Sequence, residues 1–157
     1  MRDLTRDVLA LAAQYEPRRL LAAGEAAKRL LEYYQDDAVR IDHLDPATAS
    51  PAADTQYDFA LVAGYLEQVT PHQGAALLAR LRDVQAQRFA VIVPEQRDTH
   101  WTPDTFIALG LSIHGHYREA DPPLLLATYD IANYKRTPDW LSPRNWANPE
   151  LWDKYRW

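Results

Sequence analysis

Residues 18–34 read RRLLAAGEAAKRLLEYY and hold the feature that decides the fold. An apolar run over residues 18–23 leads to a single glycine, Gly24, and a pattern of helical spacing follows at once. A strand, a tight turn and a helix in this order begin the loops that cradle a phosphate or a nucleotide, although such loops usually hold more glycines. Three interpretations are open: a cofactor loop, the remnant of one, or a tight turn alone.

The alternation of strand and helix continues along the chain. The run at residues 57–63 is too uniformly apolar for a sheet face exposed to water, so helices are expected on both sides of it. The runs at residues 112–118 and 124–130 are close enough for a hairpin. The sequence therefore predicts an α/β fold: a three-layer, Rossmann-like, mainly parallel six-stranded sheet with helices on both faces and a C-terminal antiparallel hairpin. The remaining strands are expected near residues 18–23, 38–44 and 88–93, and helices near residues 3–15, 25–34, 73–87 and 103–109, the third with Ala76, Leu77, Leu81 and Val84 facing inward.

Length and composition limit the classes of protein. A chain of 157 residues fits one domain, here residues 1–132, followed by a tail over residues 133–157. The net charge of −5 disfavours a protein that binds nucleic acid by neutralising phosphates. We find no cysteine, no apolar run long enough for a membrane span and no signal peptide, so the expected location is the cytoplasm.

Several segments coincide in order and spacing over most of residues 16–132. Asp45 follows the glycine turn by about 20 residues, the separation at which dinucleotide-binding folds place an acid that accepts hydrogen bonds from a ribose. The segment YDFALVAGYLEQV (residues 57–69) precedes LLARLRDVQAQRFAVIVP (residues 77–94) and DTFIALGLSIHG (residues 104–115). Together they resemble the class I S-adenosylmethionine-dependent methyltransferase fold, which implies the strand order 2-1-3-4-6-5. The whole chain, which ends in WANPELWDKYRW, also resembles a small bacterial family without an assigned function.

The resemblance fails at the glycine loop. In the methyltransferase family this loop runs acid-x-Gly-x-Gly-x-Gly, because the backbone must pass close to the cofactor. With Gly24 as the first glycine, Ala22 stands in place of the acid. Ala26 and Lys28 stand in place of the second and third glycines. We therefore predict that the chain takes no cofactor, with S-adenosylmethionine as the disfavoured alternative and no binding tighter than the millimolar range.

If a cofactor binds after all, the resemblance points to Gly24, Glu25, Asp45 and Gly64 as the residues that contact it. Asp45 would accept hydrogen bonds from a ribose, as would Asp42 if the strand ended earlier, whereas the alternative for Asp45 is a solvated loop acid. Residues 45–56 are too few for the helix and third strand that the full family has on the adenine side. One edge of the usual pocket is therefore expected to be absent.

Other candidate chemistry is weaker. His114 and His116 alternate along a predicted strand and would share a face, but two histidines do not make a zinc site, and we predict no metal. His43 beside Asp45, or Glu67 followed by His72, would supply a general base to a substrate lying over the strand ends. Without a cofactor they have little to act on, so we predict no catalytic residue.

The tail is the least ordinary segment, because its large aromatic rings need a surface to cover. It either folds back on its own domain, closing a sheet edge or a vacated pocket, or anchors a partner chain, since Trp and Arg dominate interface hot spots. Stacking on single-stranded nucleic acid is a third alternative, which the overall acidity disfavours. The anchor residues in either of the first two cases are Trp140, Trp146, Trp152, Trp157, Arg144 and Arg156.

Two functions follow from these observations. The first is a non-catalytic relative of the methyltransferase fold, a pseudoenzyme that binds a protein or a small molecule, with oligomers formed through the tail as an alternative. The second is an active S-adenosylmethionine-dependent methyltransferase with an atypical glycine loop. Ala22, Ala26 and Lys28 favour the first.

Deleting residues 138–157 should distinguish packing from partner binding by the tail. If the rings cover the protein's own core, each aromatic lost costs about 3–5 kcal/mol, so the melting temperature should fall sharply even in dilute solution. We expect this outcome. A truncated protein that melts within a degree or two of the intact one would instead favour a partner site.

Overall fold

The computed structural model describes residues 4–14, 17–34, 38–46, 55–96, 99–120 and 122–131. Strands and helices alternate through most of this part of the chain, as the apolar periodicity predicts. In chain order the elements are α1 (Leu4–Ala13), β1 (Arg19–Ala23), α2 (Glu25–Leu31), β2 (Arg40–Leu44), β3 (Phe59–Ala63), the short 3₁₀ helix η1 (Leu66–Gln68), α3 (Pro71–Arg80), the π-helical turn η2 (Leu81–Gln85), β4 (Arg88–Pro94), α4 (Pro103–Ala108), β5 (Ser112–Tyr117) and β6 (Leu124–Asp130).

The six strands form one sheet in the order β2-β1-β3-β4-β6-β5. β2, β1, β3 and β4 pair in parallel, whereas β6 is antiparallel to both of its neighbours. The predicted fold class, strand order and C-terminal hairpin are confirmed. β3 lies inside the sheet and is buried at all five of its residues, which explains its unbroken apolar run.

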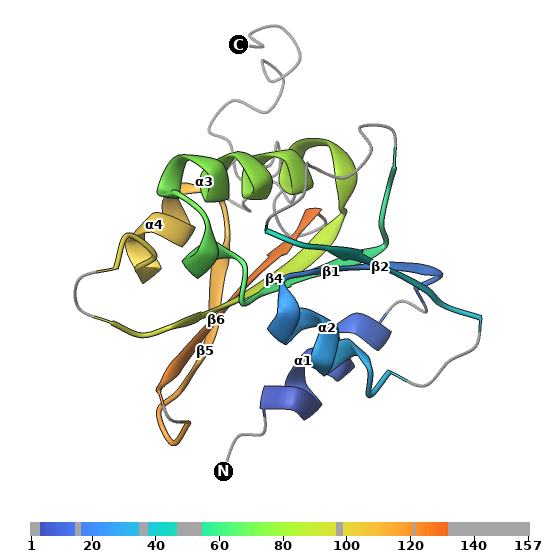
Figure 1. Cartoon of the computed structure of the whole chain (residues 1–157), viewed down its shortest axis with the longest axis horizontal. Coiled ribbons are helices and arrows are strands. Elements are labelled where there is room, and N and C mark those ends of the chain that lie inside the picture. The colour runs from blue at the N-terminus through green and yellow to red at the C-terminus, as the bar shows by residue number, and fades with distance from the viewer. Residues whose placement is uncertain are drawn as a thin grey trace, which may run out of the picture.

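Helices cover both faces of the sheet and make two separate cores. In Figure 1, α3 and α4 lie on one face, and α1 and α2 lie on the other. Alternate residues of the central strands point into each core. The buried helical residues are Leu66, Leu77, Leu78, Leu81 and Phe106 on the α3 face, and Val8, Ala12, Ala27 and Leu31 on the α1 face.

The predicted inward face of α3 is partly wrong. Leu77 and Leu81 are buried as expected, but Ala76 is exposed and Gly74 faces inward, because the ring of Trp101 packs where a side chain at Gly74 would stand. Val84 is 58% exposed. The helix ends in a π turn, in which the Ala86 N–H donates to Leu81 O at 2.8 Å. This wider turn holds one more residue than an α-helical turn, and so Gln85 rather than Val84 is buried.

Two glycine turns lock together at the carboxyl ends of β1 and β3. Gly24 has φ 98° and ψ 160°, a conformation that essentially only glycine adopts. A Cβ at this position would lie 2.2 Å from Ala63 O. Gly64 also has a positive φ of 73°, and a Cβ there would lie 3.2 Å from the Cβ of Ala26. The neighbouring backbone, rather than a ligand, therefore demands the glycine at position 24.

Replacing Gly24 with alanine should strongly destabilise the domain. Both the backbone strain and the overlap with Ala63 O oppose a side chain, so we expect a loss of about 3 kcal/mol or more and a melting temperature lower by about 10 °C. The matched variant Ala26→Gly, which restores the methyltransferase family's second glycine, should cost about 1 kcal/mol or less from helix propensity. Thermal melts of both proteins test this, and a Gly24→Ala protein as stable as Ala26→Gly would contradict it.

Candidate functional site

A hollow of about 310 Å³ lies at the carboxyl ends of β1, β2 and β3. This edge collects the residues that directly follow each strand, because the three strands are parallel and in register. Glu25 is the first residue of α2, after the turn that ends β1; Asp45 directly follows β2, and Gly64 lies in the turn after β3. The rest of the described lining is His43, Pro46 and Gln68.

The structure brings three of the four sequence-predicted cofactor residues together, namely Glu25, Asp45 and Gly64. The fourth, Gly24, is buried and is not among the described lining residues. Its N–H donates to Leu44 O at 2.9 Å, which ties the β1 turn to the end of β2. Gly24 therefore fixes the β1 turn against the end of β2, and the residues on either side of this contact line the hollow.

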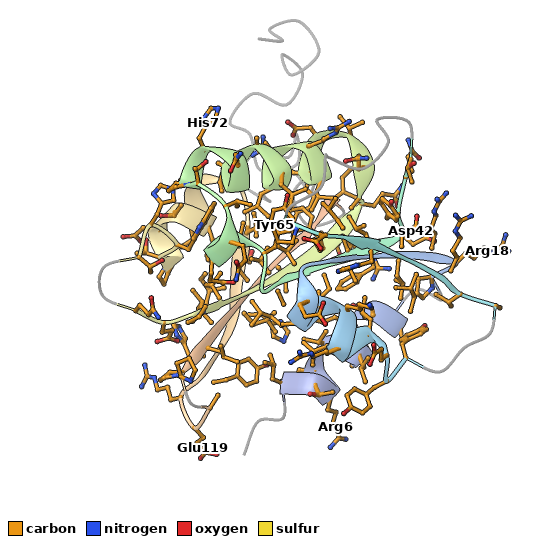
Figure 2. The ribbon with its side chains drawn as sticks, viewed as in Figure 1. Arg6, Arg18, Asp42, Tyr65, His72 and Glu119 are labelled. Atoms are coloured by element: carbon orange, nitrogen blue, oxygen red, sulfur yellow. The ribbon has the colours of Figure 1, made fainter. Side chains whose placement is uncertain are left out.

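The segment that carries Gly64 and Gln68 is fixed at both of its ends. Next to Gly64, the ring of Tyr65 is buried in the α3 core, and Figure 2 shows it between the sheet and α3. Thr70 caps α3 in a capping box with Gln73, which fixes the path of the chain after η1. Gln68 thus reaches the hollow from a segment anchored at both ends.

Asp45 rather than Asp42 is the acid at the strand ends. β2 continues to Leu44, so Asp42 stands inside the strand and Asp45 directly follows it. Asp42 Oδ2 accepts hydrogen bonds from Arg19 Nη2 at 2.8 Å and from the Tyr57 hydroxyl at 3.1 Å, and Oδ1 accepts one from Arg40 Nε at 3.1 Å. Burial alone would raise the pKa of Asp42, but these hydrogen bonds outweigh burial and lower it. Asp42 therefore has a structural role, in which it links β2 to Arg19 of β1 and to Tyr57.

The candidate general bases divide between two locations. His43 lines the hollow, one residue before Leu44 at the end of β2. Glu67 lies in η1 and His72 at the start of α3, and neither is among the described lining residues. Figure 2 shows His72 at the outer end of α3. Of these three, only His43 is brought beside Asp45.

The prediction that His114 and His116 share a face is wrong. Ile113 pairs with Ala127 and Gly115 with Leu126, so the strand bulges at His114. The extra residue reverses the alternation. His114 lines a hollow with Leu11 and Phe59 on the α1 face, and His116 lines another with Trp101 on the α4 face. No group of three or more potential metal ligands occurs within the described ranges.

The tail residues that were predicted as an anchor lie outside the described residues, so their role stays a prediction. The division of the chain into residues 1–132 and 133–157 also stays a prediction, because its second part is the tail. Sequence reasoning missed Gln68 and Pro46. The position of Pro46, two residues after β2, was a usable signal, whereas Gln68 reaches the hollow from the end of η1. Each helix in the described part of the chain is too short or too polar to cross a membrane.

Solved structures of methyltransferases share this fold. One is the 1,6-didemethyltoxoflavin-N1-methyltransferase of Burkholderia thailandensis with bound 1,6-didemethyltoxoflavin and S-adenosylhomocysteine: TM-score 0.51, 18% identity, covering 79% of this chain and 76% of that one. Another is the N-terminal domain of EvdMO1 with S-adenosylhomocysteine bound: TM-score 0.51, 16% identity, covering 83% and 82%. A third is a TehB-like S-adenosylmethionine-dependent methyltransferase from Corynebacterium glutamicum: TM-score 0.50, 16% identity, covering 82% and 89%.

These likenesses confirm the predicted class I methyltransferase fold, and at such low identities they show the fold alone. The prediction that the chain takes no cofactor is contradicted, because two of the similar structures hold S-adenosylhomocysteine. It rested on the loss of loop glycines. The structure shows that Gly24 packs against the backbone of residues 63–65, that Gly64 packs against Ala26, and that a hollow remains beside Gly64.

No curated protein matches the sequence. The family model that matches residues 2–157 is that of DUF6231, a family of unknown function, and the chain belongs to this family.

Proposed function

We propose that this member of the DUF6231 family binds S-adenosylmethionine in the strand-end hollow and is an active methyltransferase with an atypical glycine loop. The observation that carries the proposal is the location of the hollow. The chain passes from β1 to β2 on one side and then to β3 on the other, so the strand order reverses between β1 and β3. Open α/β sheets bind their ligands at such switch points, outside the carboxyl ends of the strands.

The charge of the lining fits this ligand. S-adenosylmethionine carries a positive sulfonium and an amino group, and its ribose presents two hydroxyls. The carboxylates of Glu25 and Asp45 would attract these positive charges. Asp45 directly follows β2, the position at which such folds hold a ribose by hydrogen bonds. When bound, the cofactor supplies an electrophilic methyl group.

The size and access of the hollow also support the proposal. About 310 Å³ is at the lower end of the range for small-molecule sites. Glu25, His43 and Asp45 are exposed, so a ligand reaches their polar atoms from solvent. Backbone atoms at the end of β3 already occupy the space beside Gly24. The cofactor would therefore lie against Glu25 and Gly64 rather than over a glycine-rich loop.

A non-catalytic protein that only binds the ligand is the alternative, and the substitutions Ala22, Ala26 and Lys28 favour it. Ala26 also has a structural role that is independent of a cofactor, because its methyl group packs on Gly64. Formation of S-adenosylhomocysteine in the presence of an acceptor distinguishes the two functions.

Calorimetric titration with S-adenosylhomocysteine tests the binding step. We expect an affinity tighter than millimolar, weakened by about 1–2 kcal/mol in Asp45→Asn because a neutral amide replaces the charged acceptor. The control Glu119→Gln removes one negative charge at the far tip of the β5–β6 hairpin (Figure 2), and it should bind like the unmodified protein.

Two results would refute the proposed site. One is no heat of binding in the unmodified protein at millimolar ligand. The other is equal affinity in Asp45→Asn and Glu119→Gln, which would move the ligand away from the end of β2.

A further inference from the structure

A second hollow lies on the same edge of the sheet, over the other three strands. Glu95 directly follows β4, His116 stands near the end of β5, and Leu125 near the start of β6. Because β6 is antiparallel, its start meets the ends of β4 and β5 at Leu124. The first hollow covers the ends of β2, β1 and β3, so the two hollows follow one another along the edge.

We propose that Glu95 and His116 form a proton-accepting pair in this second hollow and that the hollow takes a small aromatic molecule with a hydroxyl group, the acceptor of the methyl group. The proposal rests on the proposed function for the methyl donor. It assigns the acceptor and the residues that activate it.

The geometry of the pair fits this role. His116 Nδ1 and Glu95 Oε1 are 2.5 Å apart, and their side chains are 39% and 31% exposed. A carboxylate at Nδ1 orients the imidazole and stabilises its protonated form, while Nε2 is the ring nitrogen that takes a proton from a bound molecule. Both groups are open to a ligand and fixed to each other.

The strand bulge at His114 is what directs His116 to Glu95. In an unbroken register from the Ile113–Ala127 pair, His116 would stand opposite Leu124 and face the α1 side. With the bulge it pairs with Leu125, whose side chain belongs to the α3 core. Bulges commonly re-aim a side chain beside an active site. One extra residue thus moves the imidazole to the face that carries the second hollow.

The size and the lining of the second hollow indicate which kind of methyl acceptor fits it. Its volume is about 260 Å³, which is small for a ligand site. Trp101 is only 5% exposed and stacks on Phe106 with ring centroids 5.6 Å apart, so it is a fixed aromatic wall. Gln96 and Thr102 add polar groups. A planar ring with one hydroxyl matches an aromatic wall facing a proton acceptor.

The chemical step balances without a further reactant. Nε2 of His116 takes the hydroxyl proton as the acceptor oxygen forms its bond to the methyl carbon. The bond from that carbon to sulfur breaks, and its electron pair stays on sulfur, which becomes neutral. Glu95 stabilises the imidazolium that is formed.

The test uses 4-nitrophenol as probe and the full chain, because phenolate formation is visible by absorbance without turnover. At a pH below the probe's own pKa, we expect the protein to cause a saturable rise in phenolate absorbance. His116→Ala and Glu95→Gln should each reduce the apparent affinity by about tenfold or more. The matched control His114→Ala lies on the opposite face and should stay within about twofold of the unmodified protein. Melting curves should show that all the variants fold.

S-adenosylhomocysteine titrations of the same variants separate the two proposals. Affinity for it unchanged within about twofold in His116→Ala supports a separate acceptor hollow. No phenolate signal, or an equal loss in His114→Ala, would overturn the pair while leaving the cofactor site intact. A phenolate signal in a protein that does not bind S-adenosylhomocysteine would refute the proposed function, and with it the acceptor role.

Discussion

The approach of two glycine turns is the constraint on which the remaining structure depends. Gly24 leaves room for Ala63 O, and Gly64 leaves room for Ala26, so β1 and β3 end at the same level with their turns in contact. Side-chain atoms at position 24 would push the two turns apart. That movement would disturb the register in which β1 pairs with β2 and β3. The first hollow and the start of α2 both lie at this contact, because Glu25 follows Gly24 and Gly64 lines the hollow.

Once the strand ends are level, the site is assembled from residues that are far apart in sequence. Glu25, Asp45 and Gly64 meet because three parallel strands deliver them to one edge. Glu95 and His116 meet on the continuation of that edge because β4 and β5 flank an antiparallel β6. The order of the strands therefore places the two hollows one after the other along this edge, and the starts of α2 and α4 add Glu25 and Pro103 to their linings.

The sequence predicted the strands and the hairpin because the signals were local: apolar runs, a glycine turn and a short hairpin connection. The strand order came from the resemblance to the methyltransferase fold. Sequence reasoning failed where one residue changes the periodicity. The π turn after Arg80 exposes Val84, and the bulge at His114 sends His114 and His116 to opposite faces, although neither feature alters composition. The cofactor prediction failed for another reason, since Gly64, the partner that explains Gly24, is distant along the chain.

The ion pairs among Arg19, Arg40 and Asp42 affect the exposed edge of the sheet. β2 is the edge strand of the described sheet, and an open edge invites pairing with a strand of another molecule. Arg40, 72% exposed, lies on this edge, and Asp42 binds both Arg40 and Arg19 of the neighbouring strand. Charges fixed in this way discourage strand addition and aggregation. Within the described sheet, the exposed edge therefore carries its own protection against pairing with a strand of another molecule.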